Sequence, residues 1–179
     1  KVKVEVLDES GSKKSFYVTL SGSVTNYAFD LTGLGKIGLI NFVVDKKNGG
    51  ASGVVTLKSS GLLYIPSAPT TGAAVTALPG RPSVDSLKGA ANNGTPAAGT
   101  TITPTQSSGA DASWSYALGS DNDFVAGQIG WGYFSAPSTF VGTAQTLSSP
   151  LVLGLSGTAG VKVKVEVLDE SGSKKSFYV

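Results

Sequence analysis

An exact repeat at the two ends of the chain is the feature that most constrains its fold. Residues 1–18 read KVKVEVLDESGSKKSFYV, and residues 162–179 repeat all eighteen positions without a change. Chance does not produce such a match, and ordinary divergence of an old duplication would leave differences. The repeat divides the chain into a first copy (1–18), a body (19–161) and a second copy (162–179).

Each copy has the pattern of a strand, a turn and a second strand. Valines alternate with charged residues over 1–6, which is the period-2 pattern of a strand with one buried face. Residues 8–12 supply turn chemistry, and the alternation resumes over 16–20. The pattern favours a terminal β-hairpin, and the alternative is one long strand interrupted at Gly11.

Three interpretations of the repeat compete. The segment is a donor strand that completes the sheet of a neighbouring subunit, and its second copy fills the same groove within its own chain. Alternatively, the chain is one window of a tandem array, or the duplication is a cloning device. The apolar residues that we expect to enter such a groove are Val2, Val4, Val6, Phe16, Val18, Val163, Val165, Val167, Phe177 and Val179.

The body has the pattern of an all-β domain. Residues 19–65 look like a run of strands, in which 18–31 alternate polar and apolar positions and 36–44 form a continuous apolar run typical of a strand covered on both faces. An Asn-Gly pair within 45–50 predicts a type I′ hairpin turn, and strand patterns return over 112–155. No segment keeps a helical period, so we expect an antiparallel β-sandwich or barrel, similar to a pilin or a jelly roll.

Residues 66–111 differ in character from the rest of the body. Six of the eight prolines fall there, among alanine, glycine and threonine. This composition predicts a long Pro/Gly/Ala-rich loop region, which is either a surface excursion or an arm that contacts a neighbouring subunit. One short helix is an alternative at 84–91, with Ser83 as its cap.

The composition argues against an enzyme. The chain has no cysteine and no histidine, so it lacks disulfides, thiolate metal ligands and the commonest general base. Only 15% of residues are charged, and the net charge of +2 is too small to attract nucleic acid. No apolar run is long enough for a membrane-spanning helix. We therefore expect no catalytic residue, no cofactor, no nucleic-acid partner and no membrane insertion in this chain.

Three weaker motifs suggest binding sites in the body. The Asp-Asn-Asp triplet 121–123 resembles a fragment of a calcium loop, but the other ligands of such a loop are missing, which favours a solvated turn. Asn93 begins a glycosylation acceptor triplet that Pro96 follows directly. The aromatic residues that either form a sugar-stacking face or belong to the core are Trp114, Tyr116, Trp131, Tyr133 and Phe134.

The low charge, the absence of cysteine and the strand-like segments 1–18 and 162–179 look like those of surface-filament subunits. Donor-strand-exchange pilins and the related β-sandwich biofilm fibres have such a plan. The resemblance implies an extracellular homopolymer at the cell surface, in which a neighbour supplies a missing strand. The alternatives are a carbohydrate-binding or adhesin-type module, with surface glycans as partners, and a viral or phage shell or tail subunit.

Overall fold

The computed structural model describes residues 3–6, 13–58, 78, 82–91, 94–106, 111–135, 139–169 and 175–178. These residues form fourteen strands and one short helix, which confirms the all-β prediction. The elements are β1 (Lys3–Val6), β2 (Lys13–Thr19), β3 (Thr25–Phe29), β4 (Ile37–Asp45), α1 (Lys46–Gly49), β5 (Ser52–Leu57), β6 (Ser83–Ala90), β7 (Thr101–Gln106), β8 (Ala112–Ala117), β9 (Asp123–Gly130), β10 (Gly132–Ser135), β11 (Thr139–Gly142), β12 (Leu151–Gly157), β13 (Lys162–Asp169) and β14 (Lys175–Tyr178).

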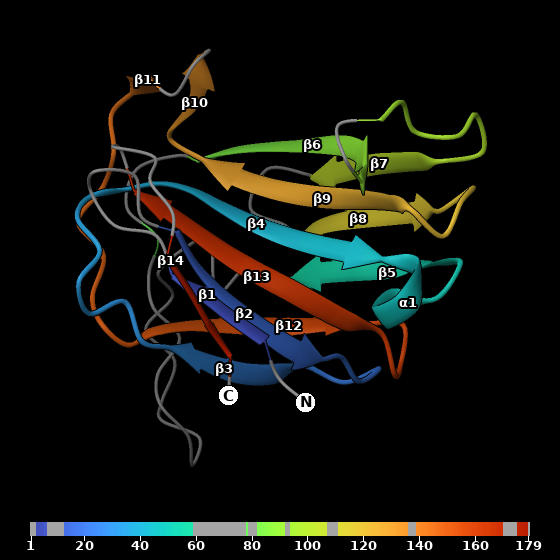
Figure 1. The fold of residues 1–179 in the computed structure, drawn as a ribbon. Coiled ribbons are helices and arrows are strands. Elements are labelled where there is room, and N and C mark those ends of the chain that lie inside the picture. Colours follow the sequence, from blue (N-terminus) through green and yellow to red (C-terminus); the bar gives the residue numbers. More distant parts are fainter. Residues whose placement is uncertain are drawn as a thin grey trace.

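Two large antiparallel sheets face each other as a sandwich (Figure 1). The first sheet has the strand order β14-β1-β2-β13-β4-β9-β6, and the second has the order β3-β12-β5-β8-β7. A separate pair, β10 and β11, stands at one end. The predicted β-sandwich is therefore confirmed.

The strands pair as a rolled-up long hairpin. The pair β2·β13 encloses β3·β12, which encloses β4·β9 and then β5·β8, and successive members of this series alternate between the two sheets. This nested pairing is the jelly-roll arrangement. The strands β6 and β7 lie between β5 and β8 in the chain and extend the two sheets at one side.

The core lies between the inner faces of the two sheets. Trp114 on β8 is 1% exposed, and its ring lies 5.3 Å from that of Phe42 on β4. Gly127 on β9 leaves room for the indole, because a Cβ at that position would collide with it. At the other side of the sandwich, the rings of Phe16 on β2 and Phe29 on β3 are 5.0 Å apart. The strand β2 therefore faces the edge strand of the second sheet.

The prediction of a hairpin turn over 45–50 is wrong. Residues 46–49 form the one-turn helix α1, and Asp45 caps it by accepting a 2.9 Å hydrogen bond from the Asn48 backbone N–H. Gly50 ends the helix with a φ of +73°, which favours glycine. Since β4 and β5 belong to different sheets, this connection carries the chain between sheets, and a two-residue turn cannot do that.

The alternative of a helix over 84–91 is also wrong, because these residues belong mainly to the strand β6. Both β6 and β7 are edge strands, where Pro104 of β7 is tolerated because an edge strand has one unpaired side. The region 66–111 is therefore not a single loop, since it contributes one strand to each sheet. The parts of this predicted loop that lie outside the described residues are 66–77, 79–81, 92–93 and 107–110.

Candidate strand-exchange site

The second copy of the repeat supplies a central strand of the first sheet. Its strand β13 lies between β2 and β4 and pairs antiparallel with both (Figure 1). Val165 lies opposite Phe16 on β2 and opposite Phe42 on β4. We use the term slot for the space between β2 and β4 that β13 fills.

The side chains of β13 alternate between the two faces of the sheet, and those on the inner face fit the slot. Val163, Val165 and Val167 are 0% exposed and belong to the same hydrophobic cluster as Ile40 and Phe42 of β4. Full burial of a valine side chain contributes about 1.5–3 kcal/mol. The three valines that the sequence predicts for the groove are therefore core residues.

The opposite face of β13 holds an ion pair between a partly buried lysine and a buried glutamate. The Lys164 Nζ atom lies 2.6 Å from Glu166 Oε1, and the Glu166 residue is only 6% exposed. The Ser15 hydroxyl, which is fully buried, donates to the same carboxylate oxygen over 3.4 Å. The charges on the face of β13 opposite the valines therefore make contacts within the chain. The sequence carries one signal for the Ser15–Glu166 contact, because a hairpin of residues 1–18 places Ser15 opposite Glu5, the first-copy counterpart of Glu166.

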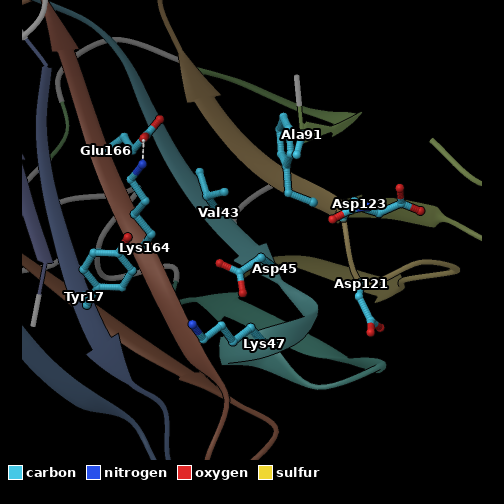
Figure 2. Close-up of a pocket in the computed structure, with 11 residues that line it drawn as sticks. Tyr17, Val43, Asp45, Lys47, Ala91, Asp121, Asp123, Lys164 and Glu166 are labelled. Atoms are coloured by element: carbon cyan, nitrogen blue, oxygen red, sulfur yellow. Dashed lines mark ion pairs between the residues drawn. The ribbon is translucent and has the colours of Figure 1, made fainter. Parts of the chain in front are cut away.

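A cavity of about 480 Å³ lies on this outer face (Figure 2). Tyr17 from β2 and Lys164 and Glu166 from β13 line one side of it, and Ala91, Asp121 and Asp123 line the opposite side. Asp45 and Lys47 lie between the two sides. The lining mixes both signs of charge, so the cavity has no clear preference for one class of ligand.

Both carboxylates of the triplet 121–123 make contacts with other parts of the chain. Lys46 lies 2.8 Å from the exposed Asp121 carboxylate, and this contact lowers the pKa of that carboxyl group. Asp123 is buried, and it accepts hydrogen bonds from the Ala97 N–H and the Thr100 hydroxyl. Among the described residues, no cluster of three or more acidic, histidine or cysteine side chains could hold a metal ion.

The two identical copies make different pairings. In the first copy, β1 and β2 pair with each other, with Glu5 opposite Ser15, so the hairpin prediction is confirmed there. In the second copy, β13 lies between β2 and β4, whereas β14 pairs with β1 at the other end of the sheet. The hairpin prediction is therefore wrong for the second copy.

The structure places only some of the other predicted groove residues. Val18 is 8% exposed, and it joins the core together with Phe16. Val4 and Phe177 lie opposite each other in β1 and β14, and Val6 lies opposite Lys175, but their side chains are outside the described part. The terminal positions Val2 and Val179 lie wholly outside the described residues.

Two of the five aromatic residues that form either a sugar-stacking face or part of the core belong to the core. Trp114 and Tyr116 are 1% and 5% exposed, so they are core residues. Of the remaining three aromatics, Trp131 is partly buried, Tyr133 is 61% exposed, and the side chain of Phe134 is not described. The candidate glycosylation residue Asn93 lies outside the described residues.

Comparisons with models of protein families, with curated proteins and with solved structures returned no match. In the part of the chain that the structure describes, no helix combines the length and the apolar character that a membrane crossing requires.

Proposed function

We propose that this protein is a structural subunit of an extracellular filament, in which one subunit donates a β-strand to the next. The observation that carries the proposal is that one sequence occurs twice and that its second occurrence fills the slot. Residues 1–8 of a neighbouring molecule offer the same side chains, in the same order, as residues 162–169.

The energetics of the slot favour such a donation. A strand that enters it gains main-chain hydrogen bonds on two sides and buries three valines, as β13 does. The ion pair on the outer face fixes the register, because a shift by one residue would turn the charges toward the core. Donation of residues 1–8 into a slot elsewhere on the neighbour is a head-to-tail contact, which builds a fibre when it does not close.

The test places the same charges in either copy of the repeat within the full chain. Val165→Asp with Val167→Asp should expel β13, since an unpaired charge is costly to bury. The slot is then open to residues 1–8 of a neighbour, and we expect filaments by negative-stain imaging and size-exclusion chromatography.

The matched control is Val4→Asp with Val6→Asp, which leaves β13 unchanged and should give a monomer. Combining all four substitutions should abolish filaments. The proposal is wrong if the Val165/Val167 variant remains monomeric at every concentration, or if the four-substitution variant forms the same filaments.

The jelly-roll pairing favours a second candidate, a subunit of a viral or phage shell, because this fold is common in such shells. That argument rests on the fold alone, which many functions share. Imaging of the assembled variant separates the two candidates, since closed particles would support the shell and contradict the filament.

A further inference from the structure

The strand β2 has the same sequence in the same register on both of its edges. On one edge Ser15 lies opposite Glu5 of β1, and on the other edge it lies opposite Glu166 of β13. Glu166 is the second-copy counterpart of Glu5. The pair β1·β14 repeats this register, with Glu5 opposite Ser176, the counterpart of Ser15.

Either copy of the repeat can therefore supply either strand of such a pair, because the same residues lie opposite each other in all three pairings. Residues directly opposite each other in an antiparallel pair lie on the same face of the sheet. If β1 took this register on the slot edge of β2, Val4 would occupy the position of Val165, and Glu5 that of Glu166.

We propose that, when β13 leaves the slot, β1 of the same chain can fill it by pairing with the slot edge of β2, and so produce a self-capped monomer that accepts no strand from a neighbour. This inference rests on the proposed function, because the slot is the same. In the slot register, Leu168 lies opposite Lys13, so its counterpart Leu7 would be joined to Lys13 by a five-residue loop, residues 8–12. Loops of this length are common in hairpins.

The protein concentration then decides whether an open slot is filled by its own chain or by a neighbouring molecule. A strand tethered by a short loop is present near its slot at an effective concentration of roughly millimolar. A dilute subunit whose slot β13 has left therefore caps itself, whereas a concentrated one exchanges strands with its neighbours, as in domain swapping.

Engineered cysteines can distinguish these states, because the chain has no cysteine of its own. Lys164 lies opposite Val43 in the structure, so Lys3, its counterpart, reaches that position only when the first copy enters a slot. The probe is Lys3→Cys with Val43→Cys in the full chain that also carries Val165→Asp and Val167→Asp. Oxidation followed by non-reducing electrophoresis should give a cross-linked monomer in dilute samples and a ladder of cross-linked oligomers in concentrated ones.

The matched control is Lys164→Cys with Val43→Cys in the otherwise unchanged chain, which should give a cross-linked monomer in dilute samples, where β13 fills its own slot. Val165→Ala with Val167→Ala supplies a milder background that buries no charge, and the fluorescence of the buried Trp114 reports folding in each variant.

Each outcome separates the two proposals. A ladder without a cross-linked monomer at any dilution overturns self-capping and supports the filament. A cross-linked monomer without a ladder at any concentration supports self-capping and overturns the filament. If folded protein in both backgrounds forms neither product, both proposals are wrong.

Discussion

The most direct consequence of the structure is that one substitution has different costs in two identical sequences. Val165 is fully buried at the centre of the first sheet, between β2 and β4. Replacing it with alanine removes two methyl groups, at about 0.8 kcal/mol each, and leaves a cavity, so we expect a loss of about 2–3 kcal/mol. Val4, its counterpart, lies in β1, which extends the sheet beyond β2. We expect Val4→Ala to cost less than half as much.

Equilibrium urea unfolding measures this difference. With a slope of about 2 kcal/mol per molar urea, the expected loss for Val165→Ala lowers the midpoint by roughly 1 M. An unchanged slope shows that stability changed and the unfolded state did not. Equal shifts for both variants, or a larger shift for Val4→Ala, would refute the placement of the second copy in the slot.

Three further predictions concern the core and the outer face. Gly127→Ala should lower stability by about 1–3 kcal/mol in urea unfolding because the added Cβ meets an indole, whereas Gly22→Ala, with open space around it, should change it little. Tyr116→Phe should cost about 1 kcal/mol through the loss of a buried 2.6 Å hydrogen bond. Burial raises the pKa of Tyr116 above its usual value of 10.0. The stabilisation that follows from this shift is therefore complete below pH 10.0 and is lost as the pH rises through the raised pKa. Urea unfolding at neutral and alkaline pH should show this loss in the parent chain and not in Tyr116→Phe. Glu166→Ala should lower the urea midpoint more than Glu5→Ala, since it leaves a partly buried lysine without its carboxylate.

The sequence predicted the parts of the fold that depend on local alternation. Valines at every second position of 162–167 indicated a strand with one buried face, and the structure buries exactly those valines. The continuous apolar run at 36–44 indicated a strand covered on both faces, and β4 is a central strand of the first sheet. These patterns are reliable because the period of two is fixed by strand geometry.

The errors arose where long-range contacts decide the structure. The Asn-Gly pair near residue 48 has the local preference of a hairpin turn, but the neighbouring strands join different sheets, so a capped helical turn forms in its place. The short segment 84–91 had a plausible helix cap, yet residues 84–90 belong to β6, which pairs along the whole of β9. In both cases the pairing partner lies far away in the chain, and no local signal reports it.

The repeat shows most clearly that local sequence does not decide strand pairing, because the two copies have identical local preferences. Residues 3–6 and 164–167 differ in nothing except the chain around them, and yet one lies beside β14 and the other lies inside the slot. Any difference in stability between matched substitutions in the two copies is therefore a tertiary effect, because the two copies have the same intrinsic strand propensity. The slot, and not the segment, selects the strand that fills it. If neighbouring molecules donate this strand as proposed, their copies of residues 1–8 would compete for the slot only through their concentration and their connection to the body.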